Sequence, residues 1–187
     1  MSQALVTIAK QMNVNQEEAQ AIINRTLLAA KGNQPTNEEV ITFLAIASEY
    51  QLNPLTREIY AFSNRGTIQP IVSIDGWLKI INQHPQFDGM EFEDHTSEGD
   101  LIAVTCKVYR KDRSRPTEVT EYMSECKGGS DPWKRWPNRM LRHKATIQAA
   151  RYAFGLSGII DPDEAERIKS TEKDMGKAEV VHKEKPS

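Results

Sequence analysis

Residues 133–155 read WKRWPNRMLRHKATIQAARYAFG, a stretch that combines signals for a helix with a high density of positive charge. Pro137 suits the first turn of a helix, and Gly155 suits the position just after its last turn. We therefore expect a helix over residues 137–154. At 100° per residue, four largely apolar residues fall along one edge of this helix: Leu141, Ala145, Ala149 and Tyr152. We expect this edge to contact the core and basic residues to occupy both flanks.

Positive charge is concentrated in the part of the chain around this helix. The formal net charge of the whole chain is only −2. Residues 1–106 carry 6 Lys or Arg against 13 Asp or Glu, a net charge of −7, whereas residues 107–151 carry 12 against 5, a net charge of +7. No acidic residue lies between positions 133 and 151 to pair with the basic ones. Such a one-sided potential favours a nucleic acid as partner, with a solvated charged surface or an acidic protein partner as the alternatives.

Length and composition indicate one soluble domain with a polar end. The 187 residues are 39% hydrophobic and 27% charged, which is enough for one buried core. We expect residues 1–170 to form a single domain and residues 171–187 to form a flexible polar tail. No apolar run approaches the roughly 20 residues that span a membrane, and the first residues do not resemble a signal peptide. A cytoplasmic location without a membrane partner is therefore expected.

The rest of the sequence predicts an α+β fold. Capping boxes, in which Asn15 and Thr36 each precede a glutamate by three residues, indicate two N-terminal helices. Residues 58–74 have the alternation and the central turn of a β-hairpin. Three more strands are expected over residues 89–94, 101–110 and 116–123. A cap at Asp161 predicts a last helix, so we expect N-terminal helices, a small antiparallel sheet of hairpins, and the basic helix and a C-terminal helix packed beside it.

Side chains that could support enzyme chemistry are few. The sequence contains neither a GxxxxGK[ST] phosphate-binding loop nor a GxGxxG motif, so ATP-driven chemistry is not expected. Cys106 and Cys126 do not form a CxxC pair and the four histidines are scattered, which argues against a disulfide framework or a zinc site. Because apolar residues alternate along the strand over 101–110, Cys106 is expected to be a core residue rather than a nucleophile.

Two rival classes of function remain open on these observations. Glu91, Glu93 and Asp94 could hold a divalent metal ion in a DNA-processing nuclease, but Glu91 and Glu93 alternate with Phe92 as on an exposed strand face. We therefore favour structural roles for these acids and expect no metal site and no catalytic residue. A duplex-binding regulator would need a helix-turn-helix pair, and no such pair of closely spaced helices is evident around the basic segment.

Several long stretches resemble one protein family. They are YQLNPLTREIYAF (50–62), DGWLKIINQHPQFDGMEFE (75–93), VYRKDRSRP (108–116), EYMSEC (121–126) and WPNRMLRHKATIQAARYAFGLSGIIDPDEAERI (136–168). These stretches closely resemble the RecT/Bet family of single-strand annealing recombinases, over residues 41–168. The resemblance implies a phage recombination protein that acts in the bacterial host cell without ATP, cofactor or covalent step. It would bind single-stranded DNA, pair complementary strands and hold the annealed duplex in a homo-oligomeric ring or helical filament.

The resemblance also implies which residues contact DNA. Basic residues that match DNA-contacting positions of the family are Arg57, Lys111, Arg139, Arg142, Lys144 and Arg151, with Arg65 in the hairpin turn as a weaker candidate. In the family, the loop that corresponds to the segment after Cys126 is longer and basic. Because this loop is shorter here, Lys134 and Arg135 are expected to compensate for its missing basic residues. Contacts that grip phosphates leave the base edges free for pairing. We therefore expect Lys144→Ala to weaken binding of single strands and to lower its salt dependence.

Three further expectations concern contacts other than phosphate binding. Trp133 and Trp136 could stack on bases or pack beneath the basic helix, and packing is favoured because continuous capture of bases would obstruct pairing. Trp77 is expected in the core. The opposite net charges of residues 1–106 and 107–151 predict head-to-tail assembly. A phage exonuclease and a host single-strand binding protein are expected as partners only if the full-length protein has the further C-terminal domain known in the family.

Overall fold

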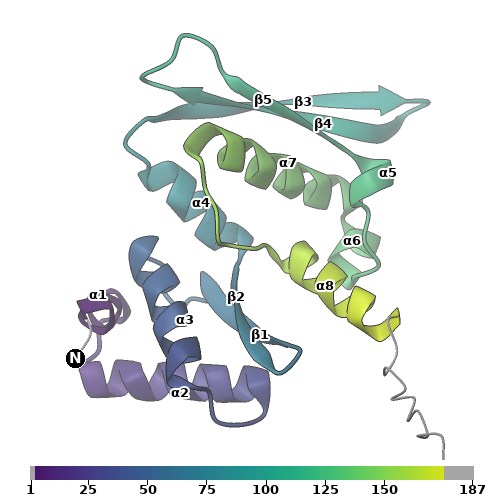
Figure 1. The fold of residues 1–187 in the computed structure, drawn as a ribbon. Coiled ribbons are helices and arrows are strands. Elements are labelled where there is room, and N and C mark those ends of the chain that lie inside the picture. Colours follow the sequence, from purple (N-terminus) through teal and green to yellow (C-terminus); the bar gives the residue numbers. More distant parts are fainter. Residues whose placement is uncertain (1–2, 175–187) are drawn as a thin grey trace, which may run out of the picture.

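The computed structural model describes residues 3–174 and has the expected α+β arrangement. The N-terminal part consists of α1 (Gln3–Met12), α2 (Gln16–Lys31), α3 (Asn37–Glu49), β1 (Ile59–Asn64), β2 (Thr67–Val72) and α4 (Ile74–Gln83). The remainder consists of β3 (Phe87–Ser97), β4 (Asp100–Arg110), β5 (Thr117–Tyr122), α5 (Met123–Cys126), α6 (Asp131–Arg135), α7 (Pro137–Phe154) and α8 (Pro162–Asp174). The β1–β2 hairpin lies among the N-terminal helices, and the β3–β4–β5 sheet lies at the other end of the molecule (Figure 1).

Both predicted capping boxes are confirmed. The Asn15 side chain accepts a hydrogen bond from the Glu18 amide, and Glu18 accepts one from the Asn15 amide at the start of α2. Thr36 and Glu39 make the same reciprocal pair at the start of α3. Such caps satisfy amides that have no partner within the helix and contribute about 1 kcal/mol each. A hydrogen bond from Lys31, aided by those from backbone amides, lowers the pKa of Glu39 to about 2.

The three-stranded sheet places one row of β4 side chains against α7. Val104, Cys106 and Val108 are fully buried in a cluster with residues of α7, whereas Ile102, at the start of the row, is 46% exposed. The prediction that Cys106 is a core residue is confirmed, and burial raises the pKa of its thiol to about 11. Trp77 on α4 is also fully buried, as expected, in the cluster formed by the N-terminal helices and the hairpin.

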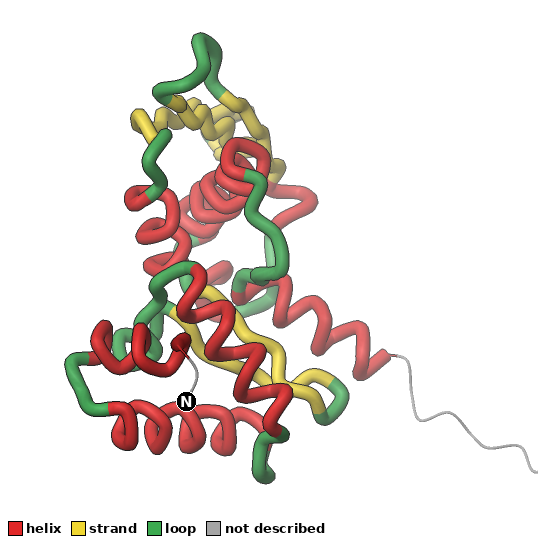
Figure 2. Tube along the Cα trace, turned by 60° about the vertical axis from the view of Figure 1, so that its left-hand side comes forward, coloured by secondary structure: helices red, strands yellow, loops and turns green. Residues whose placement is uncertain are grey.

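The basic helix α7 begins at Pro137 and ends at Phe154, as predicted, and Gly155 follows with a left-handed φ of 66°. It lies between the two sheets, which stand at separate levels with helices between them (Figure 2). Leu141, Ala145 and Ala149 pack toward the β3–β5 sheet, while Ile147 packs into the N-terminal cluster. The predicted core contact is therefore confirmed for Leu141, Ala145 and Ala149, but it is wrong for Tyr152, and a second side of α7 is buried as well. Because α7 is covered on two sides, its apolar residues do not form a single stripe, and Tyr152 is 72% exposed.

The last helix, α8, packs on the hairpin. Ala165 forms a small buried cluster with Phe62 and Ile71. Residues 171–174 of the expected polar tail belong to α8, and the remainder of that tail, residues 175–187, lies outside the described residues. Within residues 3–174, no helix has the length and apolar character needed to cross a membrane.

Candidate nucleic-acid interface

The first half of α7 and the uncovered part of β3 form the two sides of a shallow groove. Because α7 packs mainly against β4 and β5, part of β3 is left uncovered (Figure 1). Phe92 and Asp94 on β3 lie opposite Cys106 and Val104 in the antiparallel register. Residues that oppose each other in this way point to the same face of a sheet. Phe92 and Asp94 therefore point to the side of the sheet that carries α7, and Phe92 is 38% exposed there.

Two arginines of α7 form the opposite side of the groove. The Arg142 Nη2 atom lies 2.9 Å from both carboxylate oxygens of Asp94, and the guanidinium lies 5.2 Å from the centre of the Phe92 ring. Arg139, about one turn earlier, lines the same hollow of about 380 Å³. The Arg142 and Asp94 side chains are 47% and 46% exposed, and pairs screened in this way contribute at most about 1 kcal/mol. Arg142 can therefore exchange Asp94 for a phosphate group at low cost.

Trp136 extends this surface at the junction of α6 and α7. Its side chain lies at the surface, with the residue 47% exposed, so the expectation that it packs beneath the helix is wrong. The guanidinium groups of Arg139 and Arg135 lie 5.2 Å and 5.9 Å from the centre of its indole ring. Arg135 also pairs with Asp131 at 3.0 Å, and both of these side chains are largely exposed. Each of the two groove arginines thus lies beside an exposed aromatic ring, Arg139 beside Trp136 and Arg142 beside Phe92.

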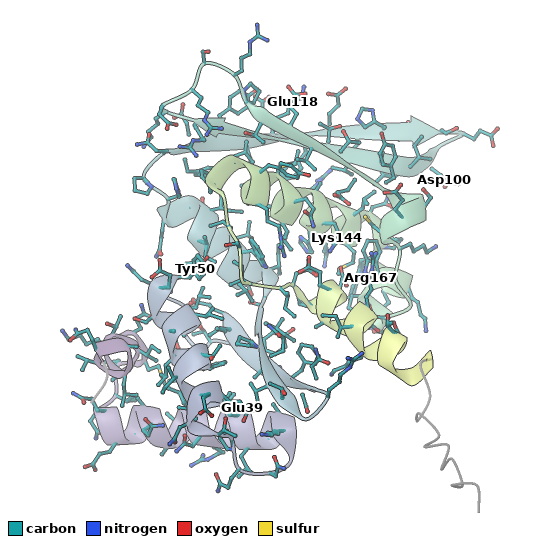
Figure 3. The ribbon with its side chains drawn as sticks, in the orientation of Figure 1. Glu39, Tyr50, Asp100, Glu118, Lys144 and Arg167 are labelled. Atoms are coloured by element: carbon teal, nitrogen blue, oxygen red, sulfur yellow. The ribbon has the colours of Figure 1, made fainter. Side chains whose placement is uncertain are left out.

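Lys144 points away from the groove and into the protein, between α7 and α8 (Figure 3). Its side chain is 6% exposed, and its Nζ atom donates a hydrogen bond to Asp161 at 2.8 Å. The other oxygen of Asp161 accepts hydrogen bonds from the Asp163 and Glu164 amides and so caps α8, as the sequence predicted. The ammonium group is buried and its charge is balanced, so the phosphate contact predicted for Lys144 would require this pair to open.

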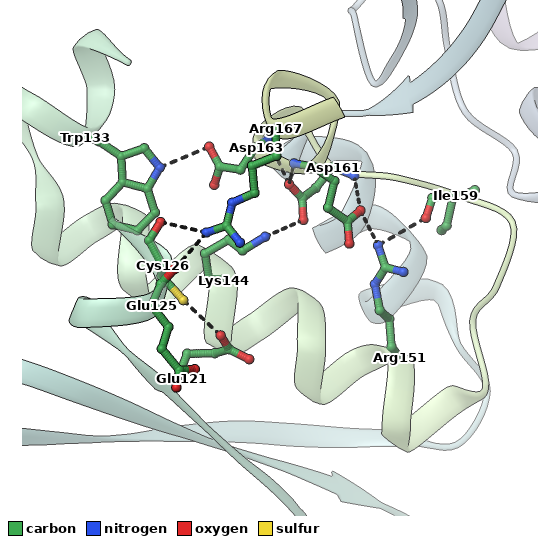
Figure 4. Close-up of polar contacts among 11 residues, drawn as sticks. Glu121, Glu125, Cys126, Trp133, Lys144, Arg151, Ile159, Asp161, Asp163 and Arg167 are labelled. Atoms are coloured by element: carbon green, nitrogen blue, oxygen red, sulfur yellow. Dashed lines mark hydrogen bonds and ion pairs between the residues drawn. The ribbon is translucent and has the colours of Figure 1, made fainter. Parts of the chain in front are cut away.

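Arg151 makes a second link between α7 and α8 (Figure 4). Its Nη2 atom donates to Glu164 at 2.7 Å and to the Ile159 carbonyl oxygen at 3.1 Å. The guanidinium lies 5.0 Å from the centre of the Trp77 ring, and the side chain is 22% exposed. Arg151 therefore holds the segment before α8, and the phosphate contact predicted for it would compete with these hydrogen bonds.

The remaining contacts in Figure 4 fix α8 to α5 and α6. Trp133 is fully buried and its indole N–H donates to Asp163 at 3.0 Å, so the packing predicted for this tryptophan is confirmed. Burial raises the pKa of Asp163, and the hydrogen bond from Trp133 partly offsets that effect. Arg167 donates to the carbonyl oxygens of Glu125 and Cys126 at 3.0 Å and 3.1 Å. Burial also raises the pKa of the Cys126 thiol to about 12, so this thiol stays protonated.

The other predicted DNA contacts lie outside the groove. Lys111 is exposed in the β4–β5 turn, and Arg65 is exposed in the β1–β2 turn, at the opposite end of the molecule (Figure 1). Arg57 precedes β1, with its guanidinium 5.4 Å from the centre of the Tyr60 ring. Of the nine predicted residues, the structure brings together four exposed ones on α6 and the start of α7: Lys134, Arg135, Arg139 and Arg142.

The three acids considered for a nuclease do not converge. The Tyr109 hydroxyl donates to Glu91 at 2.9 Å, and Lys107 pairs with Glu93 at 3.2 Å. Asp94 points to the opposite face of the sheet, where it pairs with Arg142. In the described part of the chain, no group of three His, Cys, Asp or Glu side chains is arranged to hold a metal ion.

His143 also lines the groove, and its surroundings favour the neutral form of its imidazole. Burial lowers the pKa of its imidazole below the ordinary value of 6.5, and the Arg139 guanidinium lowers it further. The positive potential of the groove therefore comes from arginine side chains. Sequence reasoning missed Phe92 and Asp94 as parts of this surface, because their contact with Arg142 joins positions nearly fifty residues apart.

Comparison with known proteins identifies the class of protein: the chain belongs to the RecT family of recombination proteins. The model of this family matches residues 15–176. A curated relative is "Recombination protein bet" of Escherichia phage lambda, which is 43% identical over 183 residues. The match covers 90% of this chain and 68% of that protein. The resemblance that the sequence motifs carry is therefore confirmed.

Proposed function

We propose that this chain anneals complementary DNA strands in the cytoplasm of a bacterial host, without ATP and without a covalent step. The observation that carries the proposal is the arginine-lined groove between β3 and α7, with its exposed aromatic rings, in a chain of the RecT family. Arginines bind phosphates of any sequence, and aromatic rings accept any base. Contacts of this kind hold a strand and leave its pairing edges free.

The groove supplies the contacts that such binding needs. Arg139 and Arg142 reach it from α7, while Lys134 and Arg135 extend the positive surface along α6. Asp94 neutralises Arg142 in the absence of DNA, and a phosphate group takes its place when a strand enters. Because the contacts are exposed and electrostatic, binding is expected to weaken steeply as the salt concentration rises.

Assembly of several copies is the second part of the proposal. Residues 1–106 carry a net charge of −7 and residues 107–151 a net charge of +7. Surfaces of opposite charge on one chain favour head-to-tail contacts, which close into a ring or continue as a helical filament. Light scattering with annealed strands should report particles much heavier than one 21.2 kDa chain. Monodisperse single chains under those conditions would contradict assembly.

The decisive experiment measures pairing directly. Two complementary oligonucleotides, one with a donor and one with an acceptor dye, are mixed with the protein, without ATP and with excess EDTA. We expect faster energy transfer than without protein, and a gel should show strands of unchanged length. Metal-dependent shortening of the strands in a parallel sample without EDTA would support the nuclease alternative instead.

Matched variants locate the activity in the groove. The double change Arg139→Ala with Arg142→Ala should slow pairing, because two phosphate contacts are removed. Lys10→Ala is the control, since Lys10 is an exposed cation on α1 at a distance from the groove. An equal loss in both variants would mean that pairing depends on overall charge and not on the groove.

A further inference from the structure

Trp136 differs from the other two tryptophans of the chain. Trp77 and Trp133 are fully buried, whereas Trp136 is 47% exposed. Trp136 stands at the N-terminal cap position of α7 but makes no capping hydrogen bond with its side chain. Its indole therefore contributes neither to the two large core clusters nor to the helix cap. The exposed ring is available to a ligand.

The surroundings of this ring define the chemistry of that ligand. Two guanidinium groups, from Arg135 and Arg139, lie within 6 Å of the ring centre. A ligand that suits this site carries a flat aromatic group for the indole and negative charge for the arginines. A nucleotide has both, in its base and its phosphate. Arg139 also lines the groove between β3 and α7, so a strand whose phosphates lie in the groove has bases within reach of Trp136.

Free energy favours a nucleic-acid base over a guanidinium group as the partner of the Trp136 ring. A cation–π contact at an exposed site is weaker than the stacking of a base on an aromatic side chain. Arg135 lies farther from the ring than Arg139 and is also drawn toward Asp131, so it is the easier of the two to displace. Once displaced, Arg135 is free to contact the phosphate next to the stacked base.

We propose that Trp136 stacks on an unpaired base of the bound strand and releases it when that strand becomes paired. Release follows from geometry, because the bases of a duplex have both faces covered by their neighbours and their edges occupied by the partner strand. The site thus distinguishes a strand that awaits pairing from the annealed product. This inference rests on the proposed function and adds to it the step at which the protein senses that pairing is complete.

Intrinsic fluorescence of the unmodified full chain tests the proposal. A base stacked on an indole quenches its emission, and Trp136 is the exposed tryptophan among the three. A single-stranded oligonucleotide should lower the emission, and its complement should restore it as the strands pair. An oligomer of deoxyribose phosphate without bases should bind without quenching. Quenching by that oligomer, or emission that stays low after pairing, would overturn the proposal.

Two variants separate stacking from phosphate binding. Trp136→Ala should weaken single-strand binding by about 5- to 150-fold, the range that the loss of one stacked base gives. Its salt dependence should stay unchanged, because no phosphate contact is removed. Tyr152→Ala is the matched control, since Tyr152 is an exposed aromatic residue at the other end of α7. Trp136→Phe keeps a ring at the site, so it should bind more tightly than Trp136→Ala.

The outcomes also separate this inference from the proposed function. Normal annealing without any quenching would overturn the role of Trp136 and leave the annealing function standing. Absence of annealing with clear quenching by single strands would remove the annealing function, and the stacking site itself would stand. An affinity of Trp136→Ala equal to that of the unmodified chain would overturn the stacking site in either case.

Discussion

The two flanks of α7 both carry basic residues and use them in opposite ways. On one flank, Arg139 and Arg142 reach a solvent-exposed groove, and the acid paired with Arg142 is itself half exposed. On the other flank, Lys144 and Arg151 are turned inward and their charges are balanced by carboxylates at the start of α8. The comparison shows that a run of basic residues locates charge along the sequence but does not tell which charges face solvent.

The cause of the difference is what packs on each flank. Arg139 and Arg142 lie beside a part of β3 that α7 leaves uncovered, so their side chains extend toward water. The other flank faces the start of α8, where Asp161 and Glu164 cap the helix. Acidic side chains are favourable at that end of a helix. The same two carboxylates therefore satisfy the amides of α8 and neutralise the cations of α7.

Among the variants that test this difference, Lys144→Met is expected to change the free energy of unfolding most. Removal of the ammonium group leaves the Asp161 carboxylate buried without its partner, which costs about 3–5 kcal/mol in the free energy of unfolding. Urea denaturation measures this loss. A free energy of unfolding within about 0.5 kcal/mol of the unmodified chain would show that the pair is not buried in solution.

A double variant provides the control for that prediction. Lys144→Met combined with Asp161→Asn removes both charges, and asparagine still caps a helix well. Because replacement of a whole buried ion pair is often close to neutral, the double variant should recover most of the lost stability. Equal instability of the single and double variants would mean that the loss comes from packing and not from an unpaired charge.

A smaller loss of stability is expected from Arg151→Lys. Lysine keeps the charge but cannot donate in the same fork to Glu164 and to the Ile159 carbonyl oxygen, nor lie flat over Trp77. We expect a loss of about 1–3 kcal/mol, in the range for a broken hydrogen bond of a charged group. Arg142→Lys, on the exposed flank, should change stability by less than about 1 kcal/mol. If both changes cost the same, the two flanks of α7 do not differ in the proposed way.

Prediction from sequence worked for features that local rules decide. The bounds of α7 follow from Pro137 and Gly155, the capping boxes from residues three positions apart, and the fold class from alternating strands. The candidate DNA-binding site was predicted less well, because the burial of a side chain depends on which distant segments of the chain pack together. Asp94 and Asp161 neutralise cations of α7, a stretch of sequence without acidic residues. No local sequence pattern predicts these two pairs. The burial of Trp133 likewise depends on where α8 lies, because its indole contacts Asp163 of that helix.

Changes on the exposed flank of α7 should affect DNA binding without affecting stability. Arg139→Ala and Arg142→Ala should each lower the salt dependence of single-strand binding by about 0.7, and the double variant by about 1.4. Each should change the free energy of unfolding by less than about 0.5 kcal/mol. The sequence alone predicted this lower salt dependence for Lys144→Ala, and we propose it here for the two arginine variants. Titrations at several salt concentrations measure the slope, and an unchanged slope for either variant would remove that arginine from the interface.

The smallest expected effect lies at His143, which lines the groove together with Arg139 and Arg142. Burial and the Arg139 guanidinium both lower the pKa of this imidazole, while Asp163 and Asp75 oppose them. Arg139→Ala removes one of the two lowering effects, so the pKa should rise toward 6.5 but stay below it, because burial remains. Arg142→Ala is the control and should leave the pKa unchanged. Titration of the imidazole by NMR measures both values.

The same pKa sets the sign of a pH effect on stability. The native state binds the proton of His143 less readily than the unfolded chain, so its contribution to stability is present above pH 6.5 and declines as the pH falls toward the native pKa. Arg139→Ala should make that decline shallower. If Arg139→Ala left both the imidazole pKa and the decline unchanged, the Arg139 guanidinium would not face His143. The position of Arg139 at the wall of the groove would then have to be given up.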